Sequence, residues 1–109
     1  MATSREFIEF ILDNLSGLDG ITHRMMMGEY IIYYHGKIAA LVCDDRLLVK
    51  PVPSALRLMP DARREPPYEG AKEMLLVEAV DDRDFLQKLF TEIEPELEPP
   101  KPKKKRSGR

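Results

Sequence analysis

The strongest constraint on the fold is a long run of strand-forming residues, 22–50, that short breaks divide into pieces. β-branched and aromatic side chains crowd this run, and the breaks fall at Gly28, at His35–Gly36 and at Asp44–Asp45. Apolar pieces separated by such short turn signals are typical of neighbouring antiparallel strands. The run therefore predicts an antiparallel meander of about four strands.

The break at His35–Gly36 has the length of a two-residue hairpin turn. Such a turn fixes three cross-strand pairs: Tyr34 with Lys37, Ile32 with Ala39, and Tyr30 with Leu41. The flanking strands, residues 30–34 and 38–43, lack a clean alternation of apolar and polar residues. We therefore expect both strands to be central in the sheet and covered on both faces, by helices or by a partner.

Amphipathic helices are expected before and after the meander. Thr3 and Glu6 form a capping-box pattern, and the apolar residues that follow recur at helical spacing, which predicts a helix from about Ser4 to Leu15. Beyond the meander the pattern predicts further elements: a short helix from Pro53 to Met59, a loop, a strand over 73–80, and a last helix that Asp81 and Asp84 begin and that ends near Glu94.

A chain of 109 residues has room for one ordinary domain. We expect that domain over residues 1–97, with an α+β fold. Its largely antiparallel sheet comprises the meander and one later strand, packed with N-terminal and C-terminal helices. Residues 98–109 are rich in proline and lysine without apolar periodicity, which is typical of a disordered tail.

Cysteine content and the first residues indicate the cellular compartment. Cys43 is the only cysteine, so no disulfide forms within the chain. Arg5 and Glu6 interrupt the apolar run that a secretory signal needs. No apolar run approaches the roughly 20 residues that a membrane-spanning helix requires. We expect a cytoplasmic protein without a membrane segment.

The residue types that carry most chemistry are few, and the predicted meander separates them. At about 3.3 Å per residue, Cys43 lies roughly 20 Å from His35 and roughly 16 Å from His23, beyond hydrogen-bond reach. Two histidines and one cysteine in separate elements are also a poor set of metal ligands. The glycines match no phosphate-binding fingerprint. The sequence therefore predicts no catalytic residues, no metal site, no cofactor and no enzymatic activity.

Charge is divided unevenly along the chain. Residues 101–109 hold six of the 17 basic residues and no acid, so the tail carries +6 and residues 1–100 carry −8. Such a tail can bind nucleic acid without sequence preference, through Lys101, Lys103, Lys104, Lys105 and Arg106. The alternative is a solvated tail that keeps an acidic domain soluble or folds loosely against its glutamates. Nucleic-acid contact is expected through the tail only.

Methionine and tyrosine residues supply the candidates for protein binding. Met25 belongs to a run of three methionines, whose unbranched side chains repack easily around a partner. Tyr30 and Tyr34 combine an apolar ring with a polar hydroxyl. The alternative for all three is burial in the core. We expect a protein partner, and also consider a homodimer, with Met25, Tyr30 and Tyr34 as the candidate contacts.

The order of residues in the meander is similar to a known pattern: an arginine, methionines, a glycine, tyrosines, a turn glycine with lysine, an Ala-Leu-Val strand, an aspartate pair and a closing lysine. These positions are Arg24, Met26, Met27, Gly28, Tyr30, Ile32, Tyr33, Gly36, Lys37, Ala40, Leu41, Val42, Asp44, Asp45, Leu47 and Lys50. They resemble the N-terminal domain of the TfoX/Sxy family of bacterial competence regulators, over residues 3 to about 95. Met27, Glu29 and Ile31 depart from the phenylalanine and glycines usual there.

This resemblance implies a regulatory role without enzymatic activity. Members of the family support expression of DNA-uptake genes together with the cyclic AMP receptor protein. The resemblance also implies an α+β domain with one largely antiparallel sheet, and it supplies no catalytic residues. Full-length regulators carry a second, C-terminal domain, where this sequence continues into the lysine-rich tail.

Overall fold

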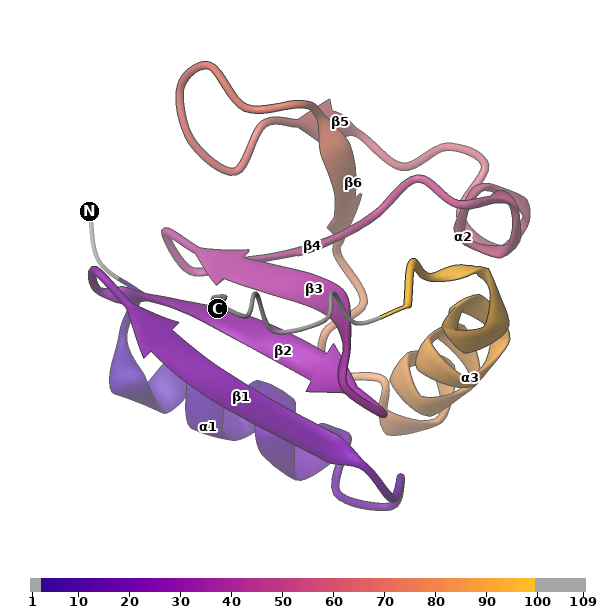
Figure 1. Ribbon diagram of the computed structural model, residues 1–109, viewed down its shortest axis with the longest axis horizontal. Helices are drawn as coiled ribbons and strands as arrows, with labels where there is room; N and C mark the ends of the chain where they lie inside the picture. Colours follow the sequence, from indigo (N-terminus) through magenta and orange to yellow (C-terminus); the bar gives the residue numbers. More distant parts are fainter. Residues whose placement is uncertain (1–2, 100–109) are drawn as a thin grey trace, which may run out of the picture.

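The structure, a computed structural model, describes residues 3–99 and has the predicted α+β architecture (Figure 1). Residues 22–50 form the predicted meander. Its strands are β1 (Ile21–Met26), β2 (Glu29–Tyr34), β3 (Lys37–Cys43) and β4 (Arg46–Val49). Two later strands, β5 (Arg64–Glu65) and β6 (Met74–Val77), complete an antiparallel sheet of order β1-β2-β3-β4-β6-β5. The expected strand over 73–80 is therefore shorter, and β5 lies where the sequence predicted only a loop.

Three two-residue turns join the strands of the meander. Each turn has positive φ at both residues: 56° and 84° at Met27 and Gly28, 54° and 79° at His35 and Gly36, and 57° at both Asp44 and Asp45. Positive φ at both positions defines the turn whose twist matches that of antiparallel strands. A residue other than glycine costs about 1–2 kcal/mol in this region, and asparagine and aspartate tolerate it better than other residues with a side chain. The turns therefore fix where each strand begins.

The register of the β2–β3 hairpin matches the prediction only next to the turn. Tyr34 pairs with Lys37 as predicted, but the pairing shifts between Ile32 and Tyr33. Beyond that point Ile32 pairs with Ala40 rather than Ala39, and Tyr30 pairs with Val42 rather than Leu41. A bulge adds one residue to one strand, so every pair after it moves by one position. The two predicted pairs beyond the bulge were therefore wrong.

Three helices flank the strands: α1 (Arg5–Asn14), α2 (Pro53–Leu58) and α3 (Arg83–Ile93), the last followed by a 3-10 turn, η1 (Glu94–Glu96). Asp82, rather than the predicted Asp81 or Asp84, caps α3 by accepting a hydrogen bond from the backbone N–H of Phe85. Such a cap contributes about 1 kcal/mol to the stability of a helix. The acid-rich start of this helix was thus located correctly, to within one residue.

Ser4 caps α1, not Thr3 as the capping-box pattern predicted. Thr3 instead ties the start of α1 to the β3–β4 turn. Its hydroxyl donates to the carbonyl of Val42 at 3.2 Å and accepts from the N–H of Asp45 at 3.3 Å. The N–H of Ser4 donates to Oδ1 of Asp45 at 2.8 Å. The start of the first helix is therefore anchored to a turn about forty residues away in sequence.

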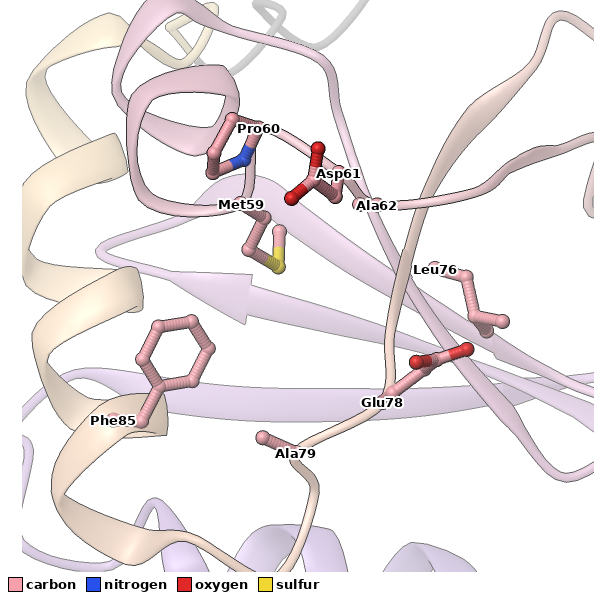
Figure 2. A pocket seen from close by; sticks show the side chains of 8 residues that line it. All are labelled: Met59, Pro60, Asp61, Ala62, Leu76, Glu78, Ala79 and Phe85. Atoms are coloured by element: carbon pink, nitrogen blue, oxygen red, sulfur yellow. The ribbon is translucent and has the colours of Figure 1, made fainter.

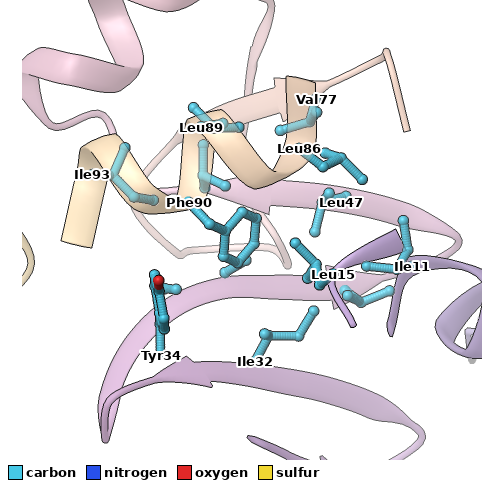
Figure 3. Close-up of a cluster of buried hydrophobic side chains, with 14 of the residues drawn as sticks. Ile11, Leu15, Ile32, Tyr34, Leu47, Val77, Leu86, Leu89, Phe90 and Ile93 are labelled. Carbon is cyan, nitrogen blue, oxygen red and sulfur yellow. The ribbon is translucent and has the colours of Figure 1, made fainter. Parts of the chain in front are cut away.

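The hydrophobic core lies between the helices and one face of the sheet, which we call the helix face (Figure 3). Phe90 of α3 is fully buried and points toward Ile32 and Tyr34 of β2. Ile11 and Leu15, at the end of α1, close the same cluster. Burial of large apolar side chains of this kind, each worth about 1.5–3 kcal/mol, is what holds α1 and α3 on the sheet.

The other face of the sheet, which we call the open face, carries no helix within residues 3–99 (Figure 1). Successive residues of a strand point to opposite faces, so the residues that alternate with the core residues along β2 and β3 lie on the open face. Ile31, Tyr33 and Leu41 are only half-buried, and Ile38 is exposed. The prediction that both central strands are covered on both faces was therefore wrong for the open face.

Two glutamates of η1 hold the C-terminal segment against the fold. Glu96 accepts hydrogen bonds from the N–H of Ser54 at 2.8 Å and from its hydroxyl at 2.6 Å, so it caps α2 from a distant part of the chain. Glu94 accepts from Nζ of Lys37 at 3.0 Å and contacts Nδ1 of His35 at 3.2 Å. These donors lower the pKa of both carboxyl groups below the ordinary value of 4.5.

We predict that Glu96→Gln lowers the melting temperature at neutral pH, because the amide cannot replace the charged acceptor at Ser54. The folded-state pKa of Glu96 is depressed, so its contribution to stability is present above about pH 4.5 and is lost as the pH falls through the folded value. The difference in melting temperature between the wild type and the variant should therefore shrink in acid. Circular dichroism melts across a pH series measure this difference.

Glu98→Gln is the matched control, because Glu98 is exposed and makes no ion pair within residues 3–99. A pH-independent effect of Glu96→Gln, or an equal effect of Glu98→Gln, would contradict the role assigned to the cap.

Candidate functional site

A continuous groove crosses the open face of the sheet. Three cavities of about 140, 470 and 430 Å³ follow one another and share lining residues. Leu41 and Tyr68 line both the first and the second cavity, and Lys50 and Glu98 line both the second and the third. We call this surface the open-face groove.

Apolar and aromatic side chains form much of the groove. Ile31 and Leu41, a cross-strand pair of β2 and β3, form part of its floor. Tyr33 and Ile38 continue the floor toward the third cavity, and Met74 of β6 lines the second. An exposed apolar surface of this extent, rimmed by polar residues, is typical of a binding surface.

Arg46 fixes one wall of the groove. Its guanidinium pairs with Oε1 of Glu65 at 2.7 Å and donates to the carbonyls of Pro66 at 3.3 Å and Pro67 at 3.1 Å. This hydrogen bonding holds the loop before β6 beside the sheet. Tyr68, the next residue of that loop, is 62% exposed and lines two of the cavities. The wall is therefore a positioned tyrosine rather than a loose loop.

Three cations that line the groove, Arg24, Lys50 and Lys72, make no ion pair within the described residues. Glutamates line it as well, namely Glu29, Glu73, Glu96 and Glu98. Arg24 and Lys50 both line the third cavity, and neither makes an ion pair within the described part of the chain. Glu98 is the acid that lines this cavity. At the third cavity the two cations outnumber the one acid among the described residues that line it, so the local charge there favours an anionic group of a ligand, although the body of the protein as a whole is acidic.

Cys43 lies at the first cavity but is a poor nucleophile. Its side chain is 2% exposed. Burial, followed by the thiol's hydrogen bond to Glu29 and the charge of that carboxylate, raises the pKa of Cys43 to about 12. A thiolate is the reactive form of cysteine, so a thiol with this pKa stays protonated at neutral pH.

The two histidines do not meet the cysteine. His35 occupies the β2–β3 turn, at the opposite end of β3 from Cys43, which at about 3.3 Å per residue is roughly 20 Å away. His23 lies on β1 opposite the core residue Ile32, so its side chain is on the helix face, whereas Cys43 lines the first cavity of the groove. Within residues 3–99, no group of three His, Cys, Asp or Glu side chains is placed to hold a metal ion.

The structure separates the three residues proposed for protein binding. Met25 and Tyr30 are cross-strand partners, and Met25 is 63% exposed while Tyr30 is half-buried. Tyr34 is 7% exposed, and its ring stacks on His35 with centroids 4.4 Å apart. Met25 and Tyr30 thus lie together near the β1–β2 turn, whereas Tyr34 belongs to the core. The basic residues 101–109 lie outside the described residues.

A further pocket of about 270 Å³ lies between the end of α2, β6 and the start of α3 (Figure 2). Met59 and Phe85 point toward the same space, and the carboxylates of Asp61 and Glu78 lie at its rim. No histidine, cysteine, serine or lysine is among the described residues that line this pocket, and its ionisable side chains are the two carboxylates. The open-face groove therefore remains the better candidate site.

Sequence reasoning missed most of the groove, including Arg24, Tyr33, Lys50 and Tyr68. The available signal was the alternation of strand residues: once Ile32 and Tyr34 are assigned to the core, Ile31 and Tyr33 must point to the other face. Tyr68 had no such signal, because it lies in a loop whose position depends on Arg46.

The chain matches a family model over most of its length. Residues 13–92 match the TfoX N-terminal domain, which is not known as a family of enzymes. The chain is also 29% identical over 105 residues to an uncharacterized 12.7 kDa protein in the trpE 5′ region of Spirochaeta aurantia, covering 95% of this chain and 91% of that protein. No solved structure matches the chain. Since the family model covers well over half of the sequence, the chain belongs to the TfoX N-terminal domain family.

Proposed function

We propose that this protein is a non-enzymatic regulatory domain of the cytoplasm that acts by binding an extended, acidic segment of a partner protein in the open-face groove. The observation that carries the proposal is the groove itself, with its apolar floor and with Arg24 and Lys50, two cations without an ion pair within the described residues, at its third cavity. Membership of the TfoX N-terminal domain family supports a role in regulation, and we include control of competence or other transcription in that role.

The shape of the groove favours an extended segment over a compact ligand. Its cavities follow one another across several strands instead of enclosing one space. An extended peptide presents alternate side chains to the surface beneath it, so apolar residues of the peptide can contact Leu41 and Tyr33. Its acidic residues can then pair with Arg24 and Lys50. Tyr68 supplies an aromatic wall of the kind that is enriched at interfaces.

The absence of catalysis is part of the proposal and has its own support. Cys43 is buried with a raised pKa, and both histidines lie away from it. The carboxylate of Glu29 lies within hydrogen-bond reach of Cys43 at the first cavity, but its hydrogen bond and its charge raise the pKa of the thiol and so keep it protonated. Within residues 3–99, moreover, no helix is long and apolar enough to cross a membrane.

The peptide proposal predicts charge-dependent binding. A short fluorescein-labelled peptide of alternating acidic and aliphatic residues should bind the whole chain, and a peptide with lysine in place of each acid should not. Exchanging both cations, in Arg24→Ala/Lys50→Ala, should weaken binding of the acidic peptide by at least about tenfold, because two charged contacts are lost. Fluorescence anisotropy at constant ionic strength measures both dissociation constants.

Lys88→Ala is the matched control, because Lys88 is an exposed lysine of α3 that lines none of the groove cavities. Binding should be unchanged in that variant. Equal binding of the acidic and basic peptides, or equal losses in the double variant and in Lys88→Ala, would overturn the proposed site.

The non-enzymatic proposal predicts a slow thiol. Cys43 in the folded protein should react with a disulfide reagent at mildly alkaline pH far more slowly than in the chain unfolded by denaturant, because burial keeps it protonated and covered. The time course of absorbance at both conditions gives the two rates. A folded-state rate equal to the unfolded-state rate would contradict the assignment of Cys43 as a structural residue.

A second function, nucleic-acid binding through Lys101, Lys103, Lys104, Lys105 and Arg106, is favoured by the charge division of the sequence. It predicts that the whole chain binds labelled duplex DNA with an affinity that falls steeply with salt, while a chain ending at Glu98 does not bind. Anisotropy across a salt series compares the two. Equal, negligible binding by both chains would remove this second function.

A further inference from the structure

Strand β1 is an open edge of the sheet. It is the first strand in the order of the sheet, and within residues 3–99 its backbone hydrogen bonds as a strand go to β2 alone. Five of its six residues are exposed, with Met25 at 63% and Met26 at 51%. Natural edge strands are usually short, bulged, covered, or marked by proline or by charged side chains, of which Arg24 is the one that β1 carries. β1 is six residues long, pairs with β2 without a bulge, and contains neither proline nor lysine.

An edge of this kind has hydrogen-bonding groups to satisfy. In an antiparallel pair, alternate residues direct their N–H and C=O groups toward the neighbour, and the residues between them direct theirs outward. The outward groups of β1 can therefore pair with another strand. Figure 1 shows β1 along the outer margin of the sheet, with α1 lying beside it on the helix face. The described part of the chain leaves the outer edge open.

The geometry points to a second copy of this chain as the added strand. We propose that β1 pairs antiparallel with β1 of a second copy, about a two-fold axis normal to the sheet, with His23 at the axis. Such an axis keeps the helix layers of both copies on the same face. It therefore allows only registers in which paired residues point to the same face. Among these registers, the two that pair the most residues of β1 are centred on His23 and on Arg24.

The side chains select between these two registers. With Arg24 at the axis, two guanidinium groups lie directly opposite each other, which is unfavourable. With His23 at the axis, Ile21 lies opposite Met25 of the second copy, which is a favourable apolar pair. Thr22 then lies opposite Arg24 of the second copy, where a hydroxyl faces a donor-rich guanidinium. The register centred on His23 thus pairs residues 21–25 of the two copies and keeps the two Arg24 side chains from lying opposite each other.

The paired edges also extend the open face. Thr22, Arg24 and Met26 share that face with the open-face groove, because Arg24 and Met26 line its cavities. A dimer of this form places the two grooves side by side on one continuous face, and the helices of both copies on the other. The pairing involves neither Lys50 nor Tyr68, but it shares Arg24 with the proposed peptide site, so the sedimentation experiments below are carried out without peptide.

Sedimentation velocity of the whole chain over a range of concentrations tests the pairing, at mildly alkaline pH so that histidine carries little charge. The wild type should show a monomer–dimer equilibrium. Met25→Lys should raise the dissociation constant of the dimer by at least about tenfold, because it places a charge against Ile21 of the second copy. Met27→Lys, in the adjoining turn and outside the paired residues, should leave the dimer unchanged.

A pair of variants at Thr22 tests the register itself. Thr22→Glu should tighten the dimer about tenfold, because two carboxylates then face Arg24 across the axis, whereas Thr22→Lys should weaken it by a similar factor. Circular dichroism confirms that each variant is folded. A wild type that is monomeric at all concentrations would overturn the proposal, as would equal effects of the two methionine variants or shifts of the same sign in the two Thr22 variants.

Discussion

The two-residue turns with positive φ are the constraint on which the rest of the structure depends. Each turn consists of only two residues between the end of one strand and the start of the next. Each turn therefore sets which residues of the following strand point toward the helices. Phe90 packs toward Ile32 and Tyr34 because the turns fix which alternate residues of β2 point to the helix face. The same alternation places Ile31 and Tyr33 on the open face. One set of turns thus defines both the core and the groove.

Local signals predicted the turns and the helices well, because the residues concerned have few other uses. Glycine and aspartate tolerate positive φ. An apolar stripe at helical spacing is typical of a helix that packs one face against a core. Thr3 shows the limit of such signals. The capping box is a pattern of sequence alone, but the choice between Thr3 and Ser4 was made by contacts with Val42 and Asp45, which no local pattern contains.

The parts that sequence reasoning missed depend on contacts between distant segments. The bulge near Ile32 moves the register by one residue, and no turn signal marks it. β5 is two residues long and pairs with β6 only across a loop, so its own sequence carries little strand signal. The sequence predicted that helices or a partner cover both faces of the central strands, because the residues of both faces are largely apolar. Apolar character alone cannot distinguish a buried face from a binding face.

The place where the described chain ends has a consequence for any partner. Pro99 lines the third cavity of the groove, beside Arg24 and Tyr33. The basic residues that follow in sequence are thus tethered at the mouth of the groove by a linker of very few residues. A short tether confers an effective concentration in the millimolar range. For a partner that binds both the groove and the tail, as proposed above, two weak affinities would multiply into one stronger attachment.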